Sequence, residues 1–149
     1  MILKKFIIVF LLLLPGIVCA QTASELDVML ESNTVSAAKA ARFVLGAAGL
    51  LPEDLSGLEA ENAAYTIAFS SGWINVQPHE ALTMKNTAFL IMRAFDIKGG
   101  IMYTLMKNPR YAYREMVYRN LIPGRTDQSM IVSGWKFLQI LDRTMRIGE

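Results

Sequence analysis

The stretches LTMKNTAFLIMR (residues 82–93) and VSGWKFLQILDR (residues 132–143) decide the fold. Each has an apolar residue, a hydroxyl residue, three further positions, and then an apolar face that closes on arginine. With Thr83 placed over Ser133, the apolar positions recur at the i, i+3, i+4, i+7 spacing of one helix face. A hydroxyl ahead of such a face is typical of a helix N-cap, because its oxygen accepts a hydrogen bond from a free backbone N–H. The two stretches therefore predict two copies of one capped helix.

A third copy follows Val35, and in every copy an apolar residue directly precedes the hydroxyl. The predicted helix caps are Ser36, Thr83 and Ser133. A second shared unit precedes the last two copies, AAYTIAFSSGWI (63–74) and YAYREMVYRNLI (111–122). Gly72 and Asn120 share a column there, and these residue types best tolerate the left-handed conformation that ends a helix. The period of about 47–50 residues is typical of helix–loop–helix repeats.

These patterns predict an all-α fold, because no convincing period-two run indicates a strand. We expect three helix–loop–helix repeats at approximately residues 24–50, 61–98 and 109–148, packed as a small pseudo-threefold bundle. The first repeat is truncated, since SELDVMLES (24–32) supplies only about two helical turns. The apolar segment IMYTLM (101–106) is expected to form a short helix packed against the repeats.

Residues 1–20 have the features of a secretory signal peptide. Two lysines precede the unbroken apolar run 6–14, and small residues stand before a cleavage site that we place after Ala20. The run is short for a bilayer-spanning helix, which needs roughly 18–20 apolar residues. Residues 21–149 would then form one exported domain of the periplasm or cell envelope that does not span the membrane. A lipidated N-terminus at Cys19, the only cysteine, is the alternative.

The charge of the predicted mature chain is strongly polarised. Residues 21–83 carry eight acids and two bases, a net charge of −6, while residues 84–149 carry eleven bases and five acids, a net charge of +6. The zero net charge and predicted export argue against nucleic acid as a partner. Opposite halves of this kind make self-association possible.

The repeated unit resembles the S-layer homology (SLH) module, whose three repeats form a pseudo-threefold bundle and commonly hold exported proteins on cell-wall polymers. That family opens the second helix of each repeat with Thr-Arg-Ala-Glu. The matching segments here are SAAK (36–39), TMKN (83–86) and SGWK (133–136). The hydroxyl is present in all three, whereas the Arg and Glu positions carry other residues. The resemblance implies the bundle fold and, through the family, binding to a cell-wall polymer.

The segment KNPRYAYREMVYRN (107–120) and the loop after it contain the candidate binding surface. The helical spacing places Lys107, Arg110, Arg114 and Tyr118 on one stripe. No acid is spaced to neutralise Arg110. The candidate anion- or partner-binding residues are Lys107, Arg110, Arg114, Tyr118 and Arg125. Guanidinium groups beside tyrosines suit a phosphate, carboxylate or glycan-linked anion. A solvated helix face, or a docking surface for the acidic half of the same chain, is the open alternative.

Other residues give weaker signals. Trp73 and Trp135 fit either core packing or a stacking platform for a carbohydrate. His79, the only histidine, has no further metal ligands or orienting partner at suitable spacing. No nucleophile–base pair, phosphate-binding glycine loop or metal-ligand spacing is present, so we expect no enzyme and no cofactor. An enzyme whose site gathers several of Asp96, Glu115, Asp127 and His79 in one pocket remains the third hypothesis.

The sequence thus predicts an exported, non-enzymatic cell-envelope module that binds a cell-wall polymer or an envelope protein. The alternative is a structural subunit of a larger periplasmic assembly, in which the oppositely charged halves drive contacts between copies or with a partner.

Overall fold

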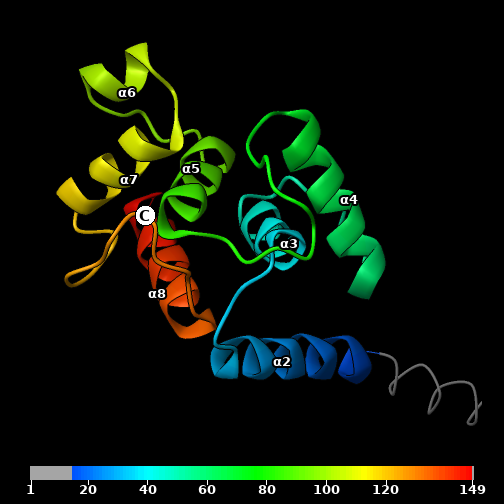
Figure 1. The fold of residues 1–149 in the computed structure, drawn as a ribbon. Coiled ribbons are helices and arrows are strands. Elements are labelled where there is room, and N and C mark those ends of the chain that lie inside the picture. The colour runs from blue at the N-terminus through cyan, green and yellow to red at the C-terminus, as the bar shows by residue number, and fades with distance from the viewer. Residues whose placement is uncertain (1–14, 149) are drawn as a thin grey trace, which may run out of the picture.

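The computed structural model describes residues 15–148, and every regular element in that range is a helix. The elements are α2 (Pro15–Glu31), α3 (Ala37–Ala47), α4 (Gly57–Ser70), α5 (Met84–Ala94), α6 (Ile101–Leu105), α7 (Pro109–Tyr118), α8 (Gly134–Met145) and a 3-10 turn, η1 (Arg146–Gly148). Within these residues the backbone forms isolated bridges but no strand. The predicted all-α fold class is therefore confirmed. Figure 1 shows α4 beside α3, α6 and α7 on the same side as α5, and α2 against the end of α8.

The three hydroxyl residues stand at equivalent helix starts. Ser36, Thr83 and Ser133 are the N-caps of α3, α5 and α8, and each has an extended backbone conformation. Each side-chain oxygen accepts a hydrogen bond from the backbone N–H three residues later, at 3.4 Å. The hydroxyl therefore compensates one of the backbone donors that a helix start leaves without an intrahelical partner.

The apolar residues ahead of these caps are joined in a closed ring of backbone hydrogen bonds. The N–H of Val35 donates to Val132 O at 3.1 Å, that of Leu82 to Val35 O at 2.9 Å, and that of Val132 to Leu82 O at 3.0 Å. All three side chains are completely buried. Each apolar residue thus anchors its helix start in the core and pairs its backbone with the other two apolar residues.

A second set of hydrogen bonds ties each helix start to a neighbouring loop. The donors and acceptors, all 2.8 Å apart, are Ala37 N–H with Glu80 O, Met84 N–H with Met130 O, and Gly134 N–H with Ser32 O. The helices pair in the same cyclic order: α3 packs most extensively on α4, α5 on α7, and α8 on α2. The first helix therefore completes the arrangement by packing on the last capped helix. A pseudo-threefold relation between whole repeats stays a prediction.

Helices α4 and α7 end in the same way. Ala68 O accepts from the N–H groups of Trp73 and Ile74 at the end of α4. In α7, Met116 O accepts from the N–H groups of Leu121 and Ile122. Gly72 and Asn120 both have positive φ, 72° and 58°, the left-handed conformation that the sequence predicts there. A hydrogen bond from the tyrosine of each helix to the following loop, Tyr65 to Val76 O and Tyr113 to Thr126 O, is also shared.

Helix α2 is longer than the two turns expected of a truncated first repeat, because it runs back to Pro15. Residues 1–14 of the predicted signal peptide lie outside the described residues, and residues 15–20 form the beginning of α2. Met29 is the buried side chain in the second half of this helix. None of the helices in residues 15–148 is both long and apolar enough to cross a bilayer.

Close packing between α2 and α8 depends on Gly134. A Cβ atom at that position would lie 1.6 Å from Met29 O and 2.7 Å from its carbonyl carbon. No side chain fits there without moving one helix, because the obstacle is backbone rather than a flexible side chain. The last capped helix thus begins in direct backbone contact with the end of the first helix.

Candidate anion-binding face

Helix α7 carries the candidate binding surface, and its start differs from the expectation. Asn108 is the N-cap, its side chain accepts from Tyr111 N–H at 3.1 Å, and Pro109 is the first helical residue. Lys107 therefore precedes the helix, and its predicted place on the α7 stripe is wrong. The Asn-Pro pair is the physical reason, since proline fits the first helical position and asparagine is a favoured cap.

Arg110 and Arg114, one turn apart on α7, are both exposed. Within residues 15–148 neither makes an ion pair. The adjacent acid, Glu115, is engaged by Arg119, whose Nε donates to Glu115 Oε1 at 2.7 Å. This is the i, i+4 partnership that the sequence indicates. The two exposed guanidinium groups therefore keep their hydrogen-bond donors for solvent or a ligand.

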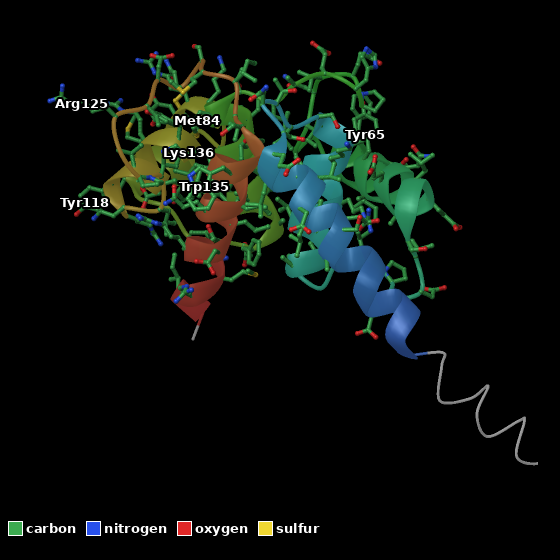
Figure 2. The ribbon with its side chains drawn as sticks, turned by 90° about the horizontal axis from the view of Figure 1, so that it is seen from below. Tyr65, Met84, Tyr118, Arg125, Trp135 and Lys136 are labelled. Carbon is green, nitrogen blue, oxygen red and sulfur yellow. The ribbon has the colours of Figure 1, made fainter. Side chains whose placement is uncertain are left out.

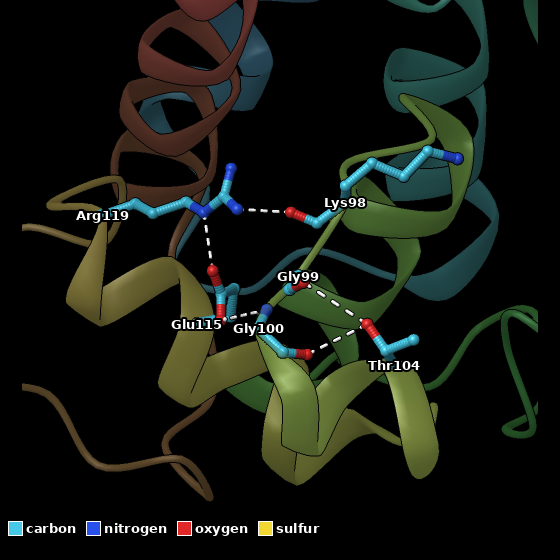
Figure 3. Close-up of polar contacts among 6 residues, drawn as sticks. All are labelled: Lys98, Gly99, Gly100, Thr104, Glu115 and Arg119. Atoms are coloured by element: carbon cyan, nitrogen blue, oxygen red, sulfur yellow. Dashed lines mark hydrogen bonds and ion pairs between the residues drawn. The ribbon is translucent and has the colours of Figure 1, made fainter.

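Glu115 fixes the loop beside α7 (Figure 3). Its second carboxylate oxygen accepts from the N–H of Gly100 at 3.0 Å, and Arg119 also donates to the carbonyl of Lys98. Partial burial alone would raise the pKa of Glu115, but the Gly100 N–H and the Arg119 guanidinium outweigh it and lower the pKa below its ordinary value. Glu115 is therefore a structural anion, held in its charged form by this loop.

The candidate residues are spread around α7 rather than gathered in one pocket. Arg114 lines a hollow of about 380 Å³ together with Tyr111 and Ile101. Lys107 lines a separate hollow of about 210 Å³ beside Arg93. The structure thus divides the predicted set between two sides of α6.

Tyr118 and Arg125 extend the face beyond these hollows. Tyr118 is 83% exposed at the end of α7, and Arg125 is exposed in the loop that follows. Figure 2 shows both side chains pointing outward at the same edge of the molecule. The result is an open cationic surface, suited to an extended ligand more than to an enclosed small molecule.

The positions that match the arginine of the SLH motif lie in the core and not on the cationic surface. Ala37, Met84 and Gly134 are all buried, and their backbone N–H groups are used in bonds to neighbouring loops. A charged side chain has no room in such an environment without a partner. The exposed arginines Arg110 and Arg114 lie outside that motif.

The other candidates lie apart from one another. Asp96 lines the hollow beside Lys107, whereas Glu115 lines the hollow beside Arg114. His79 and Asp127 are exposed loop residues, and no group of three or more potential metal ligands occurs in the described part of the chain. The four residues that the enzyme hypothesis names are thus not assembled in one pocket.

The two tryptophans differ in their surroundings. Trp73 is half-buried and packs against the core, whereas Trp135 in the first turn of α8 is 60% exposed. The core interpretation fits the first ring only. Beside Trp135, the ammonium group of Lys136 donates to Pro123 O at 2.9 Å and so ties α8 to the loop after α7.

Helix α6 shows a surface that the sequence interpretation missed. The segment 101–106 forms the expected short helix, but only Tyr103 is buried. The exposed fractions are 79% for Ile101, 51% for Met102, 74% for Leu105 and 54% for Met106. The expected short helix therefore forms and packs on α7 and the core through Tyr103, but a five-residue helix can place only one narrow stripe against its neighbours. The missed signal was the length, too short for so many apolar residues to be buried.

No protein-family model, curated protein or solved structure matches this chain. The class that the geometry itself defines is an all-α protein with three linked helix starts and an open cationic surface on α7.

Proposed function

We propose that the chain is an exported, non-enzymatic module of the cell envelope that binds an anionic cell-wall polymer, or an envelope protein, through α7. The observation that carries the proposal is the pair Arg110 and Arg114. Both are exposed and free of ion pairs within the described residues, although the chain holds thirteen acids. Placing two like charges one helical turn apart costs a few tenths of a kcal/mol. A ligand that bridges them would offset this cost.

The chemistry of the surface supports a polymeric anion. Guanidinium groups bind carboxylates and phosphates through two parallel hydrogen bonds, and the face is open rather than enclosed. Tyr118 and Trp135 offer exposed rings on neighbouring elements. The signal-peptide features, the resemblance to the SLH module and the ring of capped helices support an envelope location and a binding role.

Co-sedimentation with purified peptidoglycan sacculi tests this proposal. The parent protein is compared with the double variant Arg110→Glu/Arg114→Glu. The matched control is Lys39→Glu/Arg146→Glu, which makes the same change in net charge at exposed positions on α3 and η1. Circular dichroism establishes that all three proteins are folded.

The proposal predicts that the parent sediments with sacculi, that the α7 variant stays in the supernatant, and that the control behaves like the parent. Equal loss of co-sedimentation in both variants would show that binding depends on net charge and not on Arg110 and Arg114. Failure of the parent to bind sacculi would contradict binding to the wall polymer. Binding to an envelope protein would then require a pull-down from envelope extract that depends on the same two arginines.

A structural subunit of a larger periplasmic assembly is the second candidate. The two charged halves of the sequence form different helices, because residues 21–83 contribute most of α2 and all of α3 and α4, while residues 84–149 contribute α5 to α8. Of the four ion pairs among the described residues, none joins the two halves. Head-to-tail contacts between copies would bring these oppositely charged halves together.

Static light scattering distinguishes this candidate. Head-to-tail contacts between oppositely charged halves weaken with ionic strength, because a Debye length of about 10 Å at 0.1 M shrinks to about 3 Å at 1 M. Association at low salt that is lost at high salt would favour the subunit. A mass equal to one chain at every salt concentration would contradict it.

A further inference from the structure

Helix α6 and its C-cap Met106 expose four large apolar side chains. The helix stands out from the body of the molecule, as Figure 1 shows. Single exposed apolar residues are ordinary on a protein surface, but a contiguous apolar patch is not. Tyr103, at 5% exposure, is the only side chain of this helix that reaches the core. The side chains of Ile101, Met102, Leu105 and Met106 are each more than half exposed.

This exposure belongs to a fixed conformation. The hydroxyl of Thr104 donates to Gly100 O at 3.0 Å, and the Gly100 N–H is bound by Glu115 (Figure 3). A Cβ atom on Gly99 would lie 2.4 Å from the Tyr103 ring, so the loop packs directly on the anchor of the helix. Helix α6 is therefore held at both its start and its buried ring while its apolar side faces outward.

Cations surround the helix. Residues 93–119 carry six bases and two acids, a net charge of +4. Both acids are occupied, since Asp96 pairs with Lys98 at 2.8 Å and Glu115 pairs with Arg119. The bases without an ion pair in the described part of the chain are Arg93, Lys107, Arg110 and Arg114. Three of them line the hollows on either side of α6: Arg93 and Lys107 line one, and Arg114 lines the other.

We propose that α6 is a membrane-docking tip that inserts its apolar side chains into the interfacial layer of an anionic lipid membrane, while the surrounding cations contact the headgroups. Interfacial elements bury only one apolar face, to a depth of roughly 5–10 Å, so a short helix with exposed apolar side chains is sufficient for such docking. A stable protein partner generally covers about 800 Å² on each side, far more than one short helix offers. The ring of cations selects a negatively charged surface.

The inference does not rest on the proposed function, because its apolar anchor is α6 and its ligand is a lipid surface, although Arg110 and Arg114 on α7 belong to both proposed surfaces. It would place the module at a membrane surface of the envelope, with α7 beside the lipid. The apolar run 6–14 is a second possible route to lipid, so the readout must report on α6 itself rather than on binding of the whole chain.

A position-specific label provides that readout. In the full chain, Cys19→Ser removes the only cysteine, and Leu105→Cys then carries an environment-sensitive fluorophore. The matched control carries the label at Leu58→Cys on α4, where the leucine is 76% exposed against 74% for Leu105. The probes are vesicles of phosphatidylcholine alone and of phosphatidylcholine with phosphatidylglycerol at about 3:1, each with and without a chain-quenching lipid. Circular dichroism establishes the fold of each labelled protein.

The proposal predicts a blue shift and quenching of the label at residue 105 on anionic vesicles and neither at residue 58. The effect should need at least about tenfold more lipid on neutral vesicles, since each cation near an anionic surface strengthens binding about fivefold. Ile101→Asn should weaken the effect by about tenfold or more. Absence of quenching at residue 105, or equal quenching at both positions, would overturn the proposal. A blue shift that needs no vesicles and rises with protein concentration would also overturn it, by placing a second copy on α6.

Discussion

At the scale of single residues, two glycines on capped helices show how neighbours determine the effect of a side chain. Gly134 in α8 approaches the backbone of Met29, whereas a Cβ atom on Gly46 in α3 would meet nothing within 4 Å. Helix propensity alone favours alanine over glycine by about 1 kcal/mol at both positions. The backbone contact reverses the sign at one of them only.

We therefore predict that Gly134→Ala lowers the free energy of unfolding by about 2 kcal/mol or more, because α2 and α8 must separate to admit the methyl group. Gly46→Ala is expected to raise it by about 0.5–1 kcal/mol. Urea unfolding followed by circular dichroism measures both. Equal effects of the two substitutions would show that α2 does not pack on α8 as described.

Glu115 gives a prediction about pH. Its pKa is lower in the folded chain than in the unfolded chain, so its stabilising effect is complete above the unfolded pKa and is lost as the pH falls through the folded pKa. Glu115→Gln should lower the free energy of unfolding by about 1–2 kcal/mol at neutral pH, through the weakened bonds to Gly100 and Arg119.

The same variant should approach the parent in stability as the pH falls from neutral through the lowered folded pKa of Glu115, because the carboxyl of the parent then becomes protonated. Urea unfolding of both proteins across this pH range measures the difference. A difference that stays constant with pH would contradict the assigned hydrogen bonds. Arg146→Gln is the matched control, because its i, i+4 partner Asp142 is exposed and the pair is worth little.

At the scale of elements, the three caps offer a test of equivalence. Ser36→Ala, Thr83→Ala and Ser133→Ala should each lower the free energy of unfolding by about 0.5–1 kcal/mol, because each removes one long hydrogen bond to a helix start. Replacement by Asp should retain most of the stability. Thermal unfolding of the Ala and Asp variants at each position measures these effects. A cap whose replacement by Ala does not change stability would not be equivalent to the others.

The capped helices were predictable because their signals are local. An apolar residue, a hydroxyl and a 3.6-residue apolar period lie within one stretch of chain, and the same holds for the left-handed residues Gly72 and Asn120. The start of α7 is also predictable from Asn108 and Pro109, which favour a helix cap and a first helical position. The helical stripe therefore does not include Lys107. The exposure of α6 was not readable from residue type, because its apolar composition resembles that of a core helix.

At the scale of the whole molecule, the backbone ring is the feature that sequence could not supply. Val35, Leu82 and Val132 are about 50 residues apart, and nothing in their side chains specifies which carbonyl each N–H will meet. The clash at Gly134 has the same origin, since it depends on how α2 lies against α8. For the candidate site, the sequence provided the free arginines but not their separation from Lys107 by α6.

The ring makes a prediction for hydrogen exchange. The amides of Val35, Leu82 and Val132 lie outside the helices, yet they should exchange as slowly as the core of α5, because opening any one requires three repeats to separate. Exchange followed by nuclear magnetic resonance measures this directly. Rates as fast as that of Arg125 in an exposed loop would show that the three units open independently.

Binding of an anionic wall polymer by α7 requires contacts to Arg110 and Arg114. These contacts are measured by titrating the protein, labelled with ¹⁵N-arginine, with soluble peptidoglycan fragments and following the arginine Nε–H resonances. We expect saturable shifts for Arg110 and Arg114 and none for Arg119, whose Nε–H is already bound to Glu115. Shifts confined to other arginines, or no shifts at saturating fragment, would contradict it.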